Sequence, residues 1–344
     1  MKFTKYCSIE NTYRQKTIDS IVMSGFSGDD WFVQEKVHGS NHSLWYDGTT
    51  VKAGKKSCYI AEGDNFYNCW PVVTDNTPYI ISLYNILKLQ DPAIDIITVY
   101  GEIFGGSYPH PDVPRTQATV VQKGVFYCPD NRFYAFDIMI TKGDTTQILD
   151  MDVTEELLKT CCFFYAKTLF RGSFQDALNY SNEFQTTIPK DLGLPEIPDN
   201  ICEGVVIKPR VAKFFGCGSR VILKNKNARF TEKEKKEPKD KKIQVQDINL
   251  SDDAKAILET MEDYVTENRL RNVLSHVGGM KDHKEFGKIL GAFCKDVFDD
   301  FMKDHQESFD TLGADEQKSI RKILSNTSTT MLRSNILNII DGNF

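Results

Sequence analysis

Glu35-Lys36-Val37-His38-Gly39-Ser40-Asn41 is the segment that decides how this chain is interpreted. The apolar run Trp31-Phe32-Val33 leads into it, and Gly39 follows Lys36 by three residues. This pattern predicts a lysine at the end of a β-strand, beside a tight turn. Such a lysine can act as an amine nucleophile when burial or neighbouring cations lower its pKa and free its lone pair. Because Lys-x-x-Gly also occurs by chance, the interpretation depends on partners elsewhere in the chain.

Four further segments supply those partners. They are Tyr100-Gly101-Glu102, Phe133-Tyr134-Ala135-Phe136-Asp137-Ile138, Glu203-Gly204-Val205-Val206-Ile207-Lys208 and Lys224-Asn225-Lys226. In this order, together with the Lys36 segment, they resemble the covalent nucleotidyltransferase motifs of polynucleotide ligases and capping enzymes. The chain is most similar to the RNA ligase 2 family, which includes phage RNA ligases and kinetoplastid RNA-editing ligases. The resemblance extends from the region of Tyr6 through the C-terminal tail.

The resemblance implies a covalent mechanism with ATP. In the family, a lysine attacks the α-phosphorus of ATP, expels pyrophosphate and becomes a lysine-AMP phosphoramide, and Lys36 matches this nucleophile. The adenylate then passes to an RNA 5′-phosphate, and an RNA 3′-OH attacks it to form the phosphodiester. A surface lysine beside a turn is the alternative interpretation of Lys36 taken alone.

Three more lysines are implied to act on the nucleotide. Lys208, Lys224 and Lys226, together with a divalent metal ion, would lower the pKa of Lys36 by like-charge repulsion. The same lysines can stabilise the negative charge that develops on the phosphate, and we assign Lys224 and Lys226 to catalysis as well as to ATP binding. Lys224 and Lys226 lie two residues apart, so they share one face of a strand. An exposed strand face with alternating lysines is the alternative.

Two carboxylates follow predicted strands next to glycine. By resemblance, Glu102 binds the ribose hydroxyls of the adenosine, and Glu203 helps to hold the metal ion through its water shell. Mg²⁺ or Mn²⁺ suits this arrangement, because Mg²⁺ keeps several waters and shares few carboxylates with substrate phosphates. Each acid alone could instead be a solvated residue at a sheet edge.

The remaining nucleotide contacts also come from the resemblance. Phe136 corresponds to the aromatic residue that stacks on adenine, although a phenylalanine in such an alternating run is more often part of a core. Glu35 and Val37 belong to the same pocket, Glu35 through its backbone. Asn41 matches an asparagine near the phosphates, and its alternative role is that of a turn residue.

Three positions are implied to contact RNA. His38 stands where DNA ligases and capping enzymes have aspartate, which favours RNA ends over DNA. Lys56 stands at a family arginine position, so it would bind phosphate as a point charge and not in bidentate fashion. Arg269 lies in a segment that resembles the C-terminal domain helix and would engage the 3′-OH strand. His38 and His42 are four residues apart, but the segment reads as strand and turn, so we reject a zinc site.

Bulk composition is that of an ordinary globular protein, with 40% hydrophobic and 26% charged residues. No run approaches the roughly 20 apolar residues of a membrane span. We therefore expect no membrane partner. We also expect a monomer that resides in the cytoplasm, or in the host-cell cytoplasm if the protein is viral. The nine cysteines contain no Cys-x-x-Cys pair, so we expect reduced thiols and not a disulfide framework or a zinc site.

Charge is distributed unevenly. The net charge is −6, yet residues 220–242 carry ten Lys or Arg against four Asp or Glu. A local basic excess of this kind can bind nucleic acid even in an acidic chain, with Arg229 and Lys233 as candidates for phosphate contacts. A solvated charge run is the alternative.

The chain is predicted to be α+β. Residues 1–230 should form an antiparallel-sheet nucleotidyltransferase domain, similar to ATP-grasp-like ligases; residues 231–248 a charged linker; and residues 249–344 a small all-α domain. Strands are expected at 31–37, 43–46, 96–104, 133–141, 204–209 and 220–224, with a hairpin at Asp47-Gly48. Helices are expected at 79–88, 154–169, 251–277, 281–302, 315–324 and 329–340, with Ser251 as an N-cap.

We therefore expect an ATP-dependent RNA ligase that joins 3′-OH and 5′-phosphate RNA ends. The helical tail, in place of an oligonucleotide-binding barrel, supports nicked duplex RNA as the substrate. Two alternatives stay open: a capping or DNA-joining nucleotidyltransferase, and a non-catalytic module that binds duplex RNA.

Overall fold

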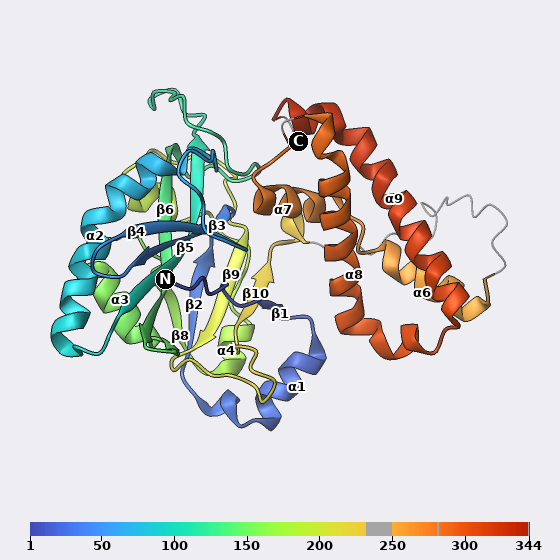
Figure 1. Cartoon of the computed structure of the whole chain (residues 1–344), viewed down its shortest axis with the longest axis horizontal. Helices are drawn as coiled ribbons and strands as arrows, with labels where there is room; N and C mark the ends of the chain where they lie inside the picture. Colours follow the sequence, from blue (N-terminus) through green and yellow to red (C-terminus); the bar gives the residue numbers. More distant parts are fainter. Residues whose placement is uncertain (232–249, 281, 343) are drawn as a thin grey trace. The chain divides into compact units, whose positions relative to one another are not determined.

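The computed structural model describes residues 1–231, 250–280, 282–342 and 344, which form two compact units (Figure 1). The first unit comprises Met1–Arg229 and the second Phe230–Phe344. The expected linker at 231–248 lies, except for its first residue, outside the described residues. The domain boundaries proposed from the sequence stay predictions.

The first sheet of unit 1 carries the Lys36 segment. Its strand order is β1-β10-β9-β2-β8. The strands are β1 (Glu10–Asn11), β2 (Trp31–Lys36), β8 (Thr168–Gly172), β9 (Gly204–Pro209) and β10 (Leu223–Lys226). All neighbours are antiparallel except β1 and β10, which are parallel.

The second sheet is antiparallel throughout, with the order β4-β3-β5-β6-β7. The strands are β3 (Ser40–Tyr46), β4 (Val51–Lys55), β5 (Ile96–Ser107), β6 (Cys128–Lys142) and β7 (Thr145–Ile148). The predicted hairpin joins β3 and β4, because Asp47 Oδ1 accepts the backbone N–H groups of Thr49 and Thr50 at 3.0 and 2.8 Å. Gly48 adopts the left-handed conformation that this turn needs, with φ +89°.

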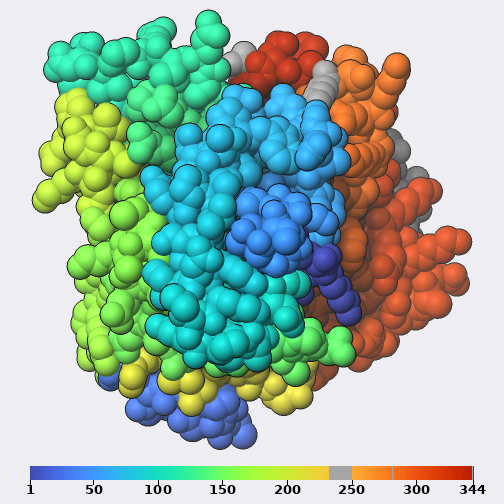
Figure 2. All heavy atoms as spheres, turned by 60° about the vertical axis from the view of Figure 1, so that its left-hand side comes forward, coloured from blue at the N-terminus to red at the C-terminus, as the bar shows by residue number. Residues whose placement is uncertain are grey.

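Helices cover one face of each sheet. Apolar residues of α2 (Cys69–Gln90) and α3 (Met151–Thr160) pack against the second sheet to form the largest core cluster (Figure 1). In the space-filling view the blue to cyan atoms around α2 cover this side of the unit (Figure 2). The first sheet packs against α1 (Gln15–Met23) and α4 (Phe174–Leu178), and unit 1 also has α5 (Ile188–Asp191) and a 3-10 turn, η1 (Phe26–Gly28).

Successive side chains of a β-strand point to opposite faces of the sheet, and this alternation determines which side chains lie on the uncovered face of the first sheet. Val33, Ile207 and Leu223 point into the core beneath the sheet. Their neighbours along the strands therefore point to the other face, where Lys36, Lys208, Lys224 and Lys226 are placed. This face is the one that carries the candidate site.

Several predicted elements of unit 1 need correction at their ends. The strands expected at 43–46 and 133–141 begin earlier, at Ser40 and Cys128, and the strand expected at 96–104 extends to Ser107. The helix expected at 79–88 begins ten residues earlier, at Cys69, and accommodates Pro78. The helix expected at 154–169 ends at Thr160, because Cys162 takes a left-handed φ of +63° and the chain then enters β8. The strand expected at 220–224 begins at Leu223 and continues to Lys226.

Unit 2 is helical, as predicted. It contains α6 (Asp252–Glu262), α7 (Glu267–Val277), the 3-10 turn η3 (His283–Glu285), α8 (Phe286–Asp310) and α9 (Ala314–Ile340), together with the 3-10 turn η2 (Ala228–Phe230) at the border between the units. The Ser251 cap is confirmed, since its side chain accepts the N–H of Ala254. No helix in the described ranges is long and apolar enough to cross a membrane.

Helix boundaries in unit 2 differ from the prediction. The helix expected from Ser251 to Val277 is two helices, because Thr266 caps a new N-terminus by accepting the N–H of Arg269. The stretch expected at 281–302 begins at Phe286 and extends to Asp310. The last two predicted stretches form one continuous helix, α9, since the polar residues between them contain no glycine or proline.

Candidate active site

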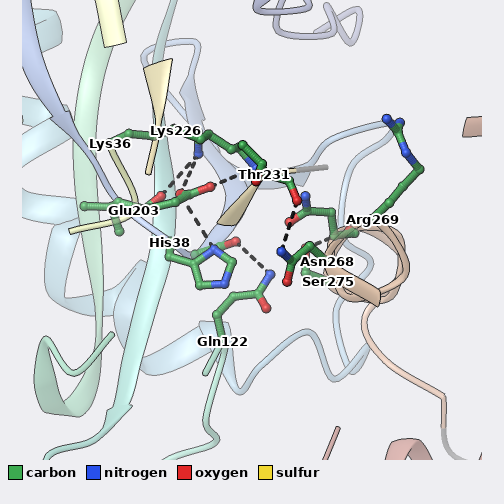
Figure 3. Close-up of polar contacts among 12 residues, drawn as sticks. Lys36, His38, Gln122, Glu203, Lys226, Thr231, Asn268, Arg269 and Ser275 are labelled. Carbon is green, nitrogen blue, oxygen red and sulfur yellow. Dashed lines mark hydrogen bonds and ion pairs between the residues drawn. The ribbon is translucent and has the colours of Figure 1, made fainter. Parts of the chain in front are cut away.

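Lys36 ends β2 and meets two carboxylates from distant segments. Its ammonium Nζ lies 2.8 Å from Glu203 Oε2 (Figure 3). The same Nζ lies 3.9 Å from Glu102 Oε1. Strand pairing produces this arrangement, because Lys36 faces Gly204 at the start of β9. Glu102 comes from β5 of the second sheet, so residues of three motifs meet here, and Lys226 of a fourth motif also contacts Glu203.

Glu203 is the centre of the cluster. Its carboxylate is 1% exposed, and its second oxygen, Oε1, lies 2.9 Å from Lys226 Nζ. His38 Nδ1 lies 3.6 Å from Oε2 (Figure 3). Burial alone would raise the pKa of Glu203, but the charges of Lys226 and Lys36 outweigh it and hold the pKa well below its ordinary value. Glu203 is therefore a buried, ionised acid between two lysines.

His38 lies beside this cluster. Burial lowers the pKa of its imidazole, and the nearby Glu203 only partly opposes that effect. His42 does not approach it as a metal partner, since His42 is fully buried beside Phe66 and Phe133, and burial lowers its pKa to about 4. Among the residues with described positions, no group of three His, Cys, Asp or Glu side chains could hold a metal ion.

Glu102, on β5, joins the turn after Lys36, here called the nucleophile turn (residues 37–39), to the second sheet. Its Oε2 accepts the backbone N–H of Gly39 at 2.9 Å. Burial raises the pKa of Glu102 to about 7, although the charge of Lys36 opposes the rise. Gly39 must be glycine for steric reasons, because a Cβ at this position would lie 2.4 Å from the carbonyl oxygen of Ile103.

A pocket opens between the uncovered face of the first sheet and the end of the second sheet. Its lining residues are Tyr6, Ile9, Gln34, Glu35, Lys36, Val37, Asn41, Glu102, Tyr134, Phe136, Ala166, Val206 and Lys208. The lining includes seven of the nine residues that the sequence assigns to the nucleotide; Lys224 and Lys226 are the other two. Their placement agrees with the prediction, whereas their roles toward a ligand stay predictions.

Lys224 and Lys226 lie on the same side of the sheet as the pocket. Lys224 is paired with Val206, which lines the pocket, and paired residues of neighbouring strands point to the same face. Lys226 contacts Glu203 directly. The predicted common face of the two lysines is therefore consistent with β10 as observed.

Glu35 faces away from the pocket. Its carboxylate accepts hydrogen bonds from the Thr186 hydroxyl, from the Thr187 N–H at 2.8 Å and from the Thr187 hydroxyl at 2.6 Å. Burial raises its pKa, with these hydrogen bonds opposing the rise. Because the side chain is engaged behind the strand, Glu35 can serve the pocket only through its backbone.

Two residues of the pocket lining, Tyr6 and Lys208, belong to an ion network around Asp137. Arg220 donates two hydrogen bonds to the Asp137 carboxylate, at 2.8 and 3.2 Å, and the Tyr6 hydroxyl donates a third. Lys208 Nζ lies 3.3 Å from Asp137 and donates to the carbonyl of Phe136 at 3.0 Å. The network fixes Lys208 beside the Phe136 ring, 5.3 Å from its centroid.

Sequence reasoning missed several lining residues. Gln34 has a usable signal, since it lies two residues before Lys36 and so shares its strand face. Tyr6 and Ala166 carry no local signal, because they come from irregular segments that only the tertiary fold brings to the pocket.

The residues predicted to contact RNA do not gather in this pocket. Lys56 is half-buried just after β4 and does not line it. Arg269 is 1% exposed within unit 2, where it binds Asp296 and Asp300 at 2.9 and 2.7 Å. This geometry gives Arg269 a structural role, and its contact with RNA stays a prediction. Arg229 is exposed, and Lys233 lies outside the described residues.

Comparison with known families decides the classification. The family model described as RNA ligase matches residues 29–226, and the model described as T4 RNA ligase 2 C-terminal matches residues 248–330. This chain belongs to the RNA ligase family. As a member of this family it is a ligase enzyme, and the α+β fold with a helical C-terminal unit is confirmed.

The relatives of this RNA ligase include two curated proteins of Trypanosoma brucei brucei. RNA-editing ligase 2, mitochondrial, is 28% identical over 89% of this chain and 84% of the relative. RNA-editing ligase 1, mitochondrial, is 26% identical over 94% of this chain and 79% of the relative. Among solved structures, an apo mutant of a Naegleria gruberi RNA ligase is 17% identical, with a TM-score of 0.46 over 66% of this chain. The match spans 57% of that ligase chain. Another structure, of a mutant Naegleria gruberi RNA ligase, contains ATP and Mn.

Proposed function

We propose that this RNA ligase uses ATP to seal nicks in duplex RNA through a lysyl-AMP intermediate on Lys36. The observation that carries the proposal is the position of Lys36, whose Nζ lies 2.8 Å from Glu203 at one end of a pocket lined by two sheets. A lysine without this setting would have neither a nucleotide to attack nor a group to hold it in place.

The first step exchanges one phosphorus bond for another. The Lys36 amine forms a bond to the α-phosphorus of ATP, and the bond from that phosphorus to the β-phosphate oxygen breaks, releasing pyrophosphate. An ammonium group has no lone pair, so before attack the Lys36–Glu203 ion pair must open and Lys36 must release one proton to solvent water. Lys226, whose Nζ lies 2.9 Å from the other oxygen of Glu203, would then stabilise charge on the phosphate.

A divalent metal ion fits this site only together with the nucleotide. Two carboxylates, Glu203 and Glu102, lie beside Lys36, and the part of the chain with described positions has no three-ligand cluster. Mg²⁺ or Mn²⁺ would therefore be held by Glu203, water and phosphate oxygens, a ligand set that such ions accept. When bound, the ion would withdraw charge from the phosphate.

The remaining pocket residues are assigned to the adenosine. Glu102, whose carboxyl faces Lys36 and the Gly39 turn, would bind the ribose hydroxyls, and Phe136 would stack on the adenine. Val37 and Asn41 would complete the pocket near the phosphates, with Glu35 contributing backbone groups. Lys208 and Lys224 would add positive charge along the same sheet face.

Duplex RNA is proposed as the substrate on the basis of relatives and sequence. The trypanosome relatives are named RNA-editing ligases, and the helical unit matches the C-terminal model of an RNA ligase. His38, Lys56 and Arg269 remain the candidates for RNA contact. The protein is proposed to act as a monomer. A cytoplasmic location stays a prediction, since the relatives are named as mitochondrial.

Labelling with nucleotides tests the proposal. The protein is incubated with each of the four α-labelled nucleoside triphosphates and analysed by denaturing electrophoresis. We expect label from ATP alone, its loss in Lys36→Ala and retention in Lys16→Ala, a control at an exposed lysine of α1. Label that persists in Lys36→Ala would show that another residue is the nucleophile.

The same preparation separates the alternatives. Label from GTP would indicate a capping enzyme, and sealing of all-DNA nicks would indicate a DNA-joining enzyme. Binding of duplex RNA without any covalent adduct would indicate a non-catalytic module.

A further inference from the structure

A closed ring of hydrogen bonds and backbone links includes the segment around Lys36. The ring consists of Glu35, Thr186, Asn200, Phe126, Tyr127 and His38. The Thr186 hydroxyl donates to Glu35, and the Thr186 N–H donates to the Asn200 carbonyl at 2.9 Å. From there the ring returns to the Lys36 segment through residues 126 and 127.

Asn200 makes the next link with both ends of its amide. Its Oδ1 accepts the N–H of Phe126 at 2.8 Å, and its Nδ2 donates to the carbonyl of Phe126 at 2.6 Å. The hydroxyl of Tyr127 then accepts the backbone N–H of His38 at 2.8 Å, which closes the ring. Four segments far apart in sequence are thus joined around residues 35–38.

The ring is buried and shaped to hold its geometry. Tyr127 is 2% exposed and Asn200 is 5% exposed, so water does not compete for these bonds. The Tyr127 ring packs edge-on against Phe104, with 5.5 Å between centroids. Asp199, just before Asn200, adopts a left-handed φ of +55°, a conformation that aspartate takes more readily than most non-glycine residues.

The ring also includes a residue close in sequence to Glu203. Asn200 lies three residues before Glu203, which precedes the first residue of β9 and so lies outside the β2–β9 ladder. On the following side, the Glu203 carbonyl accepts the N–H of Asn227 at 2.8 Å. The ring therefore constrains the preceding side of Glu203 and the following side of Lys36 at the same time.

We propose that Tyr127 and Asn200 are positioning residues that set the spacing of Lys36 and Glu203 for adenylation. Neither side chain lines the nucleotide pocket, so both act through the nucleophile turn and the Glu203 segment. This inference rests on the proposed lysyl-AMP chemistry.

The chain offers a matched control. The Tyr108 hydroxyl donates to the carbonyl of Pro195, so it also joins the loop after β5 to the segment before β9. Tyr108 is buried to a similar degree, with 4% exposure, but its bond does not belong to the ring. Tyr127→Phe and Tyr108→Phe therefore each remove one tyrosine hydroxyl bond, and only the first opens the ring.

The experiment measures single-turnover adduct formation against ATP concentration in the full chain. In Tyr127→Phe we expect the rate at saturating ATP to fall about tenfold, as for the loss of one well-placed hydrogen bond, with the half-saturating ATP concentration changed less than about twofold. Asn200→Asp keeps the oxygen that accepts the Phe126 N–H and loses the amide group that donates to the Phe126 carbonyl. Its rate at saturating ATP should fall as in Tyr127→Phe. Tyr108→Phe should keep the wild-type rate.

A second readout does not depend on the nucleotide. An amine-modifying reagent is applied at fixed pH, and modification of Lys36 is followed by peptide mass spectrometry. Opening the ring should loosen the Lys36–Glu203 pair and speed modification in Tyr127→Phe but not in Tyr108→Phe. A wild-type protein that forms no adduct would contradict the proposed function, while this readout would still decide the inference.

Several outcomes would overturn the proposal. The first is an equal fall in the rate of adduct formation in Tyr127→Phe and Tyr108→Phe. The second is a change in the half-saturating ATP concentration alone. The third is an unchanged rate of Lys36 modification in Tyr127→Phe. Thermal unfolding is recorded for each variant. If both Tyr127→Phe and Asn200→Asp fail to fold, the ring serves stability and the positioning role is rejected.

Discussion

Glu203 holds Lys36 through one carboxylate oxygen, with 2.8 Å between Oε2 and Nζ. The two residues are 167 positions apart in sequence. Since Glu203 is buried and kept ionised by Lys226 and Lys36, its negative charge is the feature that organises the cluster. The predictions below begin from that charge.

Removing the charge of Glu203 should impair adduct formation. Glu203→Gln keeps the shape of the side chain but leaves Lys36 and Lys226 side by side without a buried anion. We expect the rate of label transfer from ATP to fall at least about 100-fold, a loss typical of groups that organise charge in an active site. Glu196→Gln, at an exposed acid, is the control and should react at the wild-type rate. A Glu203→Gln enzyme that reacts as fast as this control would show that the charge is dispensable.

Glu102 should make stability depend on pH between its ordinary pKa of 4.5 and its folded pKa of about 7. In this range the folded protein binds more protons at Glu102 than the unfolded chain does, so this contribution to stability decreases as pH rises through the window. Other groups titrate as well, so the quantity to measure is the difference in unfolding free energy between wild type and Glu102→Gln. We expect that difference to shift against the wild type from pH 5 to 7, and a constant difference would disprove the raised pKa.

Asp137 should be more important for stability than a surface acid. Asp137→Asn leaves Arg220 and Lys208 buried without their shared anion, and we expect a loss of about 3–5 kcal/mol in the free energy of unfolding in urea. Asp130→Asn breaks only an exposed ion pair with Arg132 and should cost less than about 1 kcal/mol. Similar costs for the two variants would mean that the network contributes little.

Arg269 should stabilise unit 2. Its planar guanidinium binds Asp296 and Asp300 and also donates to the Tyr264 carbonyl at 3.0 Å. Arg269→Ala should lower the thermal unfolding midpoint of the full chain clearly, because it removes the buried partner of two acids. Arg269→Lys should not restore the unfolding midpoint, since one ammonium group cannot reproduce the hydrogen bonds of the planar guanidinium. Arg271→Ala, on the same helix, removes a partly exposed ion pair with Glu267 and a contact with the Phe344 ring, and should have a smaller effect. Stability unchanged in Arg269→Ala would leave the residue without the role assigned to it.

Much of the fold was predictable from local pattern. Alternating residues indicated β2, β3, β5, β6 and β9, and the helical stripes indicated an all-α tail. Errors arose where local pattern and tertiary context disagree. The break before α7 depends on the Thr266 cap, and the end of α3 depends on the left-handed Cys162, neither of which periodicity reveals.

The candidate site was only partly predictable, because a motif gives residue types and not side-chain directions. A motif marks a residue as suited to a chemistry, so Lys36, Glu102, Glu203, Phe136 and Lys208 could be selected. It does not say where a side chain points, so the engagement of Glu35 with Thr186 and the burial of Arg269 were not foreseen.

By itself, the sequence determined which residues are chemically able to act, their order along the chain and which strand face each one shares, because these follow from residue type and a period of two. Only the tertiary structure decided that Lys36 meets Glu203, that Tyr6 walls the pocket and that a ring through Tyr127 and Asn200 includes the segment around Lys36. These contacts join segments more than 70 residues apart. Their geometry comes from strand pairing and core packing across the whole unit, which no local pattern specifies.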